Sequence, residues 1–177
     1  SWAAFAHGVM AHCRDFDDTY QDSVVHPGSV VVPAALAVGE AIDAFRSDIS
    51  IVTPREADPD EILRAHATNM FDAIATTRDL PPGQIDADTY HTPSSFDVAR
   101  LAAGGSIDLA RRVLGGQAAR GLAAVRPPGH HAEAARAMGF CLFNNVAVAV
   151  RALQAEGGAP RIVIFDWDVH QGNGTQH

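Results

Sequence analysis

The stretch RIVIFDWDVH, residues 161–170, decides the fold, because an apolar run turns there into alternating acids and a histidine. Residues 162–165 are all apolar, which predicts a strand buried on both faces. Side chains two positions apart on an extended chain point the same way, so Asp166, Asp168 and His170 are expected to share one face. A carboxylate and an imidazole at this spacing suit zinc. A bare Asp-x-His motif is more often the solvent-exposed end of a strand, so this motif needs support from elsewhere in the chain.

A second group of candidate residues follows another short apolar run. Residues 121–125 (GLAAV) predict a buried strand, and the turn Pro127-Pro128-Gly129 then stops it and fixes the direction of His130 and His131. Histidine titrates near neutrality, so one ring can take a proton from water and later pass it to a leaving amine. An isolated histidine pair is more often a pair of partly exposed loop residues.

The segment between the two runs predicts a helix. Asn144 or Asn145 is the expected N-cap and Gly157 the expected terminator. The expected buried stripe consists of Val146, Ala149, Val150 and Leu153. Strand, helix and strand in this order predict two parallel strands joined by a right-handed crossover, with their carboxyl ends at one edge. Ligands of open α/β sheets bind beyond that edge, so the histidine pair and the DWDVH stretch are expected to meet there.

Upstream segments add further elements to an α/β domain. A helix is expected at residues 33–46 and a strand at 48–53. Asp58 with Glu61 predicts a capping box at the start of a short helix, and residues 79–93 predict a surface loop. Thr92-Pro93 marks the entry of a longer helix that Gly115-Gly116 ends. The apolar face of that helix is expected to comprise Phe96, Ala99, Ala103, Ile107, Ala110 and Leu114.

The composition argues against several classes of function. A formal net charge of −8 over 177 residues, without a basic cluster, argues against nucleic acid or a membrane surface as partner. The sequence contains no apolar run of about 18 residues, so no membrane span is predicted. Cys13 and Cys141 lack CxxC spacing, which makes a reducing cytoplasm the simplest location. Serine-nucleophile and nucleotide-binding motifs are absent, and Cys141 as a nucleophile is a weak alternative.

Three long motifs add a resemblance to these inferences. RPPGHHA, GFCLFNNVAVAVRAL and IVIFDWDVHQGNGTQH closely resemble the zinc-dependent histone deacetylase and acetylpolyamine amidohydrolase family, in its class II-like and bacterial form. The likeness extends back to about residue 26. It implies an arginase-like α/β fold with an open parallel sheet flanked by helices. It also implies hydrolysis of the amide of an acylated amine, either N-acetyl-lysine in a peptide or protein or an acetylpolyamine.

The resemblance assigns roles to the residues nearest the chemistry. Asp168 and His170 match two zinc ligands. His130 and His131 match the tandem histidines, of which the second is the favoured general base. Asp166 matches the acid that supports His130 and that helps Asp168 to hold a structural monovalent cation, usually K⁺.

Four further positions are assigned in the same way. Asn173 matches the residue that supports His131 by hydrogen bonding. Gly139 and Phe140 match the loop that lines the acyl-lysine tunnel. Asp88 falls near a rim position that contacts the substrate backbone.

This sequence also departs from the family pattern. Gln171 stands where the family usually repeats histidine, and HPGS at residues 26–29 replaces a more typical HPES. The family's third zinc ligand and its oxyanion-stabilising tyrosine lie downstream of DWDVH, where this chain has no residues. We therefore expect residues 1–177 to be the amino-terminal part of a deacetylase domain, inactive alone, with an exposed apolar edge near residues 161–165.

Two other interpretations stay open from the sequence. The chain can be a non-catalytic homologue that binds a full-length deacetylase as a partner or decoy. A two-metal hydrolase of the arginase kind ranks last, because Val169 and Gln171 stand where further acid ligands would be needed. The sequence does not determine the preferred acyl group or amine. A homo-oligomer is compatible with it.

Overall fold

The computed structural model describes residues 50–177. The chain divides into two units, Ser1–Val52 and Thr53–His177, and every helix and strand among residues 50–177 lies in the second unit. The helix expected at residues 33–46, Cys13 and the HPGS segment lie outside the described residues. Of the strand expected at residues 48–53, the described residues 50–53 form no regular element.

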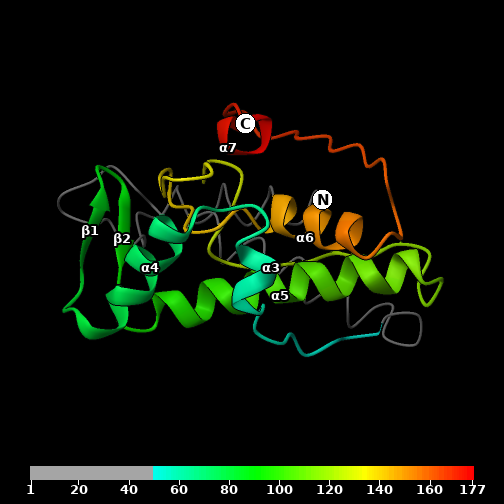
Figure 1. Ribbon diagram of the computed structural model, residues 1–177, viewed down its shortest axis with the longest axis horizontal. Coiled ribbons are helices and arrows are strands. Elements are labelled where there is room, and N and C mark those ends of the chain that lie inside the picture. Colours follow the sequence, from blue (N-terminus) through cyan, green and yellow to red (C-terminus); the bar gives the residue numbers. More distant parts are fainter. Residues whose placement is uncertain (1–49) are drawn as a thin grey trace, which may run out of the picture. The chain divides into compact units, whose positions relative to one another are not determined.

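Among residues 50–177, helix α5, Ser95–Leu114, is the longest element, and it runs along the lower side of the second unit in Figure 1. Its apolar face is confirmed at Phe96, Ala99, Ala103 and Ile107, which are buried, whereas Leu114 is exposed. Residues 55–57 cross α5 so closely at Gly104 that an added Cβ would overlap the carbonyl oxygen of Arg55. This crossing explains a glycine inside a helix, where it otherwise costs stability.

The predicted end of α5 is confirmed. The N–H of Gly116 donates to the carbonyl of Val113, and the N–H of Gln117 donates to that of Arg112. Gly116 has a positive φ of 72°, as the residue after a helix needs in this type of cap.

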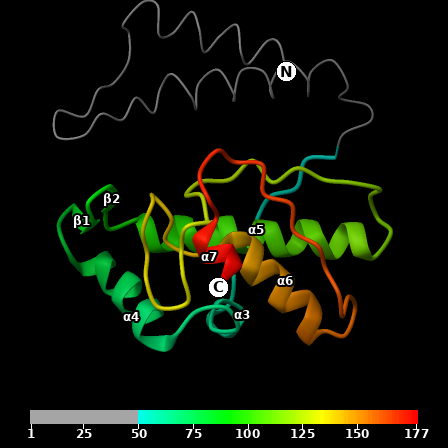
Figure 2. The same cartoon turned by 90° about the horizontal axis from the view of Figure 1, so that it is seen from above.

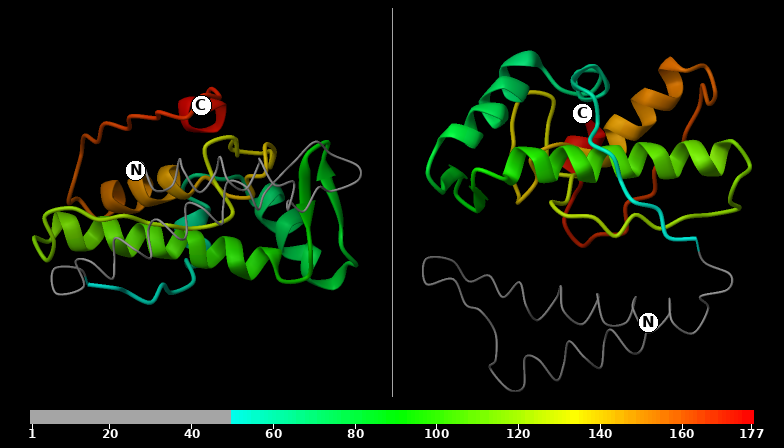
Figure 3. Two further views of the ribbon diagram at one scale, coloured as in Figure 1. Left: turned by 180° about the vertical axis from the view of Figure 1, so that it is seen from behind. Right: turned by 90° about the horizontal axis from the view of Figure 1, so that it is seen from below.

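Helix α6, Asn145–Ala155, packs against α5 (Figures 1 and 3). Asn144 is the N-cap, and its side-chain oxygen accepts the N–H of Ala147 at 3.0 Å. Gly157 ends the helix with a φ of 74°, as predicted. The predicted stripe was wrong at two of its four positions, since Val146 is exposed and Val150 is only half-buried. The buried residues are Asn145, Val148, Ala149, Ala152 and Leu153.

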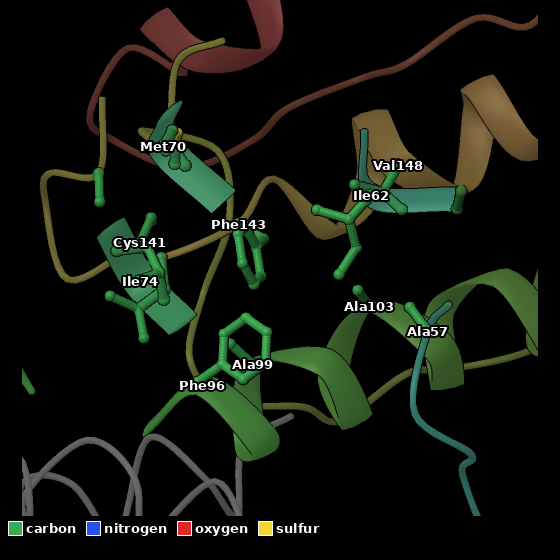
Figure 4. Close-up of a cluster of buried hydrophobic side chains, with 14 of the residues drawn as sticks. Ala57, Ile62, Met70, Ile74, Phe96, Ala99, Ala103, Cys141, Phe143 and Val148 are labelled. Carbon is green, nitrogen blue, oxygen red and sulfur yellow. The ribbon is translucent and has the colours of Figure 1, made fainter. Parts of the chain in front are cut away.

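The core gathers around Phe143, which has no exposed surface (Figure 4). Its ring lies 6.0 Å from that of Phe71 and 6.1 Å from that of Phe96. Ile62 and Val148 close the cluster and are also fully buried. Truncating such a phenylalanine to alanine typically costs about 3–5 kcal/mol. Phe143 therefore fixes the segment that leads from the histidine pair into α6.

Two short helices precede α5. Helix α3, Pro59–Ile62, begins at the predicted cap, where the N–H of Asp58 donates to Glu61 Oε2 at 2.9 Å. Helix α4, Thr68–Thr76, was not predicted and continues into the 3₁₀ turn η1, Thr77–Asp79. Its cap residue Ala67 offers no side-chain hydrogen bond, so packing of Met70 and Ile74 into the core stabilises it instead.

The expected loop at residues 79–93 contains a β-hairpin, so that prediction was wrong in part. Strands β1, Gly83–Asp86, and β2, Thr89–His91, pair antiparallel. Thr89 and His91 point inward and Tyr90 outward, which gives β2 an alternation too short to detect in a segment rich in proline and glycine. The hairpin stands at one end of α5 (Figure 2).

The two expected parallel strands do not form in the described part of the chain. Residues 121–125 and 161–168 carry no ladder, and the β1–β2 hairpin is the sheet found among residues 50–177. Val163 is 93% exposed, so no strand or helix among residues 50–177 covers its side chain. A strand without a partner lacks the hydrogen bonds that define it. The run instead leads from α6 to the short helix α7, Asn173–Gln176 (Figure 1). None of the helices in residues 50–177 combines the length and the apolar character that a membrane crossing needs.

Candidate active site

The loop after residues 126–129 carries the histidine pair. An added Cβ at Gly129 would overlap the backbone at Phe143 and Asn145, so the loop lies directly against the start of α6. The ring centroids of His130 and His131 are 4.1 Å apart. The core residue Phe143 and the start of α6 thus hold the two imidazoles side by side.

His130 pairs with the first acid of the DWDVH stretch. Its Nδ1 lies 2.9 Å from Asp166 Oδ2. The hydrogen bond from His130, together with the N–H of Asp168, lowers the pKa of Asp166. An ionised carboxylate only accepts, so His130 donates from Nδ1. Gly172 packs over this pair, because a Cβ there would overlap Asp166 Oδ2.

Asp168 and His170 form a second pair. Asp168 Oδ1 accepts the N–H of His170 at 2.8 Å and lies 3.1 Å from His170 Nδ1. The bond from the His170 N–H lowers the pKa of Asp168. Two donors on one tetrahedral zinc ion stand about 3.4 Å apart when each bond is about 2.1 Å. In this structure Oδ1 and Nδ1 are hydrogen-bonded to each other, so a zinc ion held by both atoms would replace this bond.

The structure brings the two groups together. The ring of His170 lies 6.0 Å from the ring of His131, centroid to centroid. Asp168 and His170 alone do not make a complete metal site. Among residues 50–177, no three histidine, cysteine or acidic side chains converge on one point that a metal ion could occupy.

His131 is held from the other side by α7. Its Nδ1 lies 2.7 Å from Asn173 Oδ1, at the first residue of that helix. The N–H of Gly174 donates to the carbonyl of His130 at 2.9 Å, and a Cβ at Gly174 would overlap the carbonyl oxygen of Ala132. The start of α7 is thereby fixed to the histidine loop, and Figure 2 shows the two side by side.

Gly139 and Phe140 form a tight turn beside His131. Both have positive φ, 58° and 64°. A Cβ at Gly139 would overlap ring carbon Cδ2 of His131. Phe140 is 40% exposed and lines a hollow of about 370 Å³ that Tyr90 and Leu142 also line, whereas neither histidine of the pair does.

Asp88 supports this turn from the hairpin. Its Oδ1 accepts the N–H of Gly139 at 3.2 Å, and Thr89 Oγ1 accepts the N–H of Phe140 at 3.0 Å. The structure thus places Asp88 against the Gly139-Phe140 turn. Its expected role as a substrate contact stays a prediction.

Sequence reasoning missed two supporting residues. Glu133 Oε1 accepts from Asn173 Nδ2 at 2.8 Å. His66 is buried, with Nδ1 2.9 Å from the carbonyl of Glu133 and Nε2 2.9 Å from the N–H of Asn144. Burial lowers the pKa of His66. Both residues lie in helical or loop segments without a motif of their own, so only the fold reveals them.

Comparison with known proteins identifies the family. Residues 29–177 match the family described as histone deacetylase domain. The chain belongs to the histone deacetylase family.

Its relatives in this histone deacetylase family come from distant organisms. The chain is 37% identical over 161 residues to a histone deacetylase-like amidohydrolase of Pseudomonas aeruginosa, covering 84% of the chain and 42% of that protein. It is 43% identical over 133 residues to human polyamine deacetylase HDAC10, covering 71% of the chain and 20% of that protein. The chain thus spans less than half the length of these relatives.

A solved structure confirms the fold class. The crystal structure of the HDA15 HD domain superposes with a TM-score of 0.74 at 43% identity, covering 82% of this chain and 40% of that one. The deacetylase-like α/β fold predicted from the motifs is therefore the fold of this chain. The described residues form its helical part, a hairpin and the loops that carry the histidines.

Proposed function

We propose that the protein belongs to a zinc-dependent deacetylase that hydrolyses the amide of an acylated amine, either N-acetyl-lysine or an acetylpolyamine. One observation carries the proposal: the histidine pair, each ring with its own hydrogen-bond partner, lies beside the Asp168–His170 pair. The names of the relatives, which include a polyamine deacetylase and an amidohydrolase, support the same reaction class.

Asp168 and His170 would hold the zinc ion. Oδ1 of Asp168 and Nδ1 of His170 lie 3.1 Å apart in a hydrogen bond that the ion would replace, and a catalytic zinc usually takes one further protein ligand. When bound, zinc polarises the acyl carbonyl and lowers the pKa of the attacking water. We also propose that Asp166 and Asp168 help to hold a structural K⁺ ion, because both carboxylates are ionised and adjacent.

His131 would act as the general base. Asn173 Oδ1 accepts from Nδ1 of its ring, which leaves Nε2 free to take a proton from water and to pass it to the leaving amine. Asp166 holds His130 in the orientation that places its ring against that of His131.

The substrate would pass the turn at Gly139 and Phe140. Phe140 offers an exposed apolar face on which the acyl-lysine chain can pack. Because this turn is hydrogen-bonded to Asp88 and Thr89, the hairpin fixes its distance from the histidines. An enzyme of this kind would act in the cytoplasm, with neither nucleic acid nor a membrane as its partner.

Metal dependence tests the proposal. The whole protein, as its gene encodes it, is assayed on an acetyl-lysine peptide and on an acetylpolyamine before and after chelation. We expect chelation to abolish hydrolysis and added zinc to restore it. Asp168→Asn should lower both bound zinc and kcat/KM by about 10–100-fold or more, as loss of metal-site residues typically does.

The matched control is Asp97→Asn. Asp97 pairs with Arg78 on the exposed side of α5, away from the histidines, so zinc content and activity should stay at the wild-type level. Hydrolysis that survives chelation would contradict the zinc mechanism.

A further inference from the structure

We propose that Glu133 is a positioning residue: it orients the amide of Asn173 and thereby determines which nitrogen of His131 carries the proton. The inference rests on the proposed function, because the position of that proton matters for catalysis only if His131 is the base. The observation behind it is a chain of two hydrogen bonds that joins Glu133, Asn173 and His131.

The amide of Asn173 lies between a ring and a carboxylate. Its Nδ2 is 2.8 Å from Glu133 Oε1, and its Oδ1 is 2.7 Å from His131 Nδ1. A carboxylate only accepts, so the NH₂ group must face Glu133. The carbonyl oxygen of His131 at 3.4 Å and Met138 Sδ at 3.6 Å are further acceptors around Nδ2. The surroundings of Nδ2 therefore select one of the two amide orientations, and Glu133 supplies the shortest bond.

The orientation of the amide decides the tautomer of His131. With Oδ1 facing the ring, Nδ1 must carry the hydrogen, and the lone pair of the neutral imidazole lies on Nε2. If the amide turned over, its NH₂ group would face Nδ1 and would favour the tautomer with hydrogen on Nε2. That tautomer has no lone pair on Nε2 with which to remove a proton from water.

The backbone of Glu133 is itself held by hydrogen bonds at both its N–H and its carbonyl group. Its N–H donates to the carbonyl of Arg136 at 2.9 Å, and its carbonyl accepts from His66 Nδ1 at 2.9 Å. His66 also accepts the N–H of Asn144, the N-cap of α6. The two backbone hydrogen bonds fix where the Glu133 side chain begins, and the bond from Asn173 Nδ2 then holds its carboxylate.

The first test reads the tautomer directly. In the whole protein labelled with ¹⁵N in the histidine rings, ring-nitrogen chemical shifts at alkaline pH report where the hydrogen lies, and the His131→Ala variant assigns the signals. The wild type should show hydrogen on Nδ1 of His131. In Glu133→Ala, part of the population should shift to hydrogen on Nε2. An unchanged His131 tautomer in Glu133→Ala would overturn the inference.

The second test is kinetic. Glu133→Ala should lower kcat by about 10-fold while KM stays within about 2-fold, as loss of a group that orients a catalytic side chain does. The kcat of Glu133→Gln should fall less, since the amide oxygen of the glutamine can still accept a hydrogen bond from Asn173. The control Glu56→Gln removes a glutamate paired with Arg100, outside the site, and should leave kcat unchanged. A rise in KM as large as the fall in kcat would contradict the inference, and so would a normal kcat in Glu133→Ala.

A reciprocal exchange guards against a variant that merely unfolds. Asn173→Asp places two carboxylates against each other and should lower activity strongly. Adding Glu133→Gln lets the new amide donate to that carboxylate, so the double variant should be more active than Asn173→Asp alone. A double variant as poor as the product of the two single losses would contradict the inference. If the wild type hydrolyses no acylated amine, the proposed function fails, whereas the ¹⁵N measurement still decides the role of Glu133.

Discussion

Single residues in this site are selected by the space around them. Gly129, Gly139, Gly172 and Gly174 each stand where an added Cβ would overlap a neighbour, and each overlap involves the histidine loop or its partners. Close approach of backbone to a reacting group is a common reason for glycine. The sequence shows these glycines as turn signals, but only coordinates show which ring, carboxylate or backbone segment each one accommodates.

Gly139→Ala is expected to lower catalytic activity by more than its loss of folding stability alone would cause. Its φ of 58° costs an alanine roughly 1–2 kcal/mol, and its Cβ would also displace the ring of His131. We expect kcat/KM to fall by about 10–100-fold in the whole protein, since a ring moved by about 1 Å loses its reacting geometry.

Gly157→Ala is the matched control for that variant. Gly157 has a similar φ of 74°, but nothing lies within 4 Å of the Cβ that would be added. Urea titrations should show that Gly157→Ala loses about as much free energy of unfolding as the strained φ costs Gly139→Ala. Its activity should stay unchanged. Equal activity in both alanine variants would contradict the role of the clash.

Elements are joined by one buried carboxylate as well as by the apolar core. Glu61, in α3, accepts hydrogen bonds from Nη1 and Nη2 of Arg55, each at 2.8 Å, and from Nη2 of Arg111 at 2.8 Å. Arg111 lies in α5 and also pairs with Glu156 at the end of α6. The network therefore ties the three helices that frame the histidine loop.

Glu61→Gln should destabilise the protein by roughly 1.5–3 kcal/mol at neutral pH, because it weakens hydrogen bonds from two charged arginines. Arg55 keeps Asp108 as a partner, and Arg111 keeps Glu156. Burial raises the pKa of Glu61, but hydrogen bonds from Arg55, Asp58 and Arg111 outweigh it and lower the pKa to about 2. The contribution is therefore complete above the ordinary value of 4.5 and is lost as pH falls toward about 2.

Urea unfolding at pH 7 and pH 3 measures this effect. The difference between wild type and Glu61→Gln should shrink at the lower pH. Asp97→Asn breaks an exposed ion pair with Arg78 and should change stability by less than about 1 kcal/mol at either pH. A Glu61→Gln effect that is the same at both pH values would contradict the assignment.

The sequence predicted those elements that carry their own end signals. Helix α5 ends at the expected glycines, and α6 begins at one of the two asparagines named as caps. Helix α4 lacks a cap, and the hairpin pairs strands too short for a periodic pattern, so both depend on tertiary contacts. The expected meeting of the histidine pair and the DWDVH stretch is observed, although the parallel strands that suggested it carry no ladder among residues 50–177.

At the scale of the whole molecule, one face of the DWDVH segment has no cover in the described part of the chain. Val163, Phe165, Trp167 and Val169 alternate along the extended run and are 81–93% exposed. The opposite face carries the acids and His170. An exposed apolar row of this kind is a surface on which other protein can pack.

Residues 1–177 alone should therefore associate through the row of Val163, Phe165, Trp167 and Val169. Sedimentation at rising concentration should show larger species, and in a Trp2→Phe background the emission of Trp167 should shift to shorter wavelength as they form. Val163→Thr with Phe165→Thr should move association to at least about tenfold higher concentration, since burial of each such side chain contributes about 1.5 kcal/mol or more. Val98→Thr with Val146→Thr removes two exposed valines in α5 and α6, outside this row, and should leave association unchanged. A chain that stays monomeric, with Trp167 emitting as in water at every concentration, would show that this face does not mediate self-association.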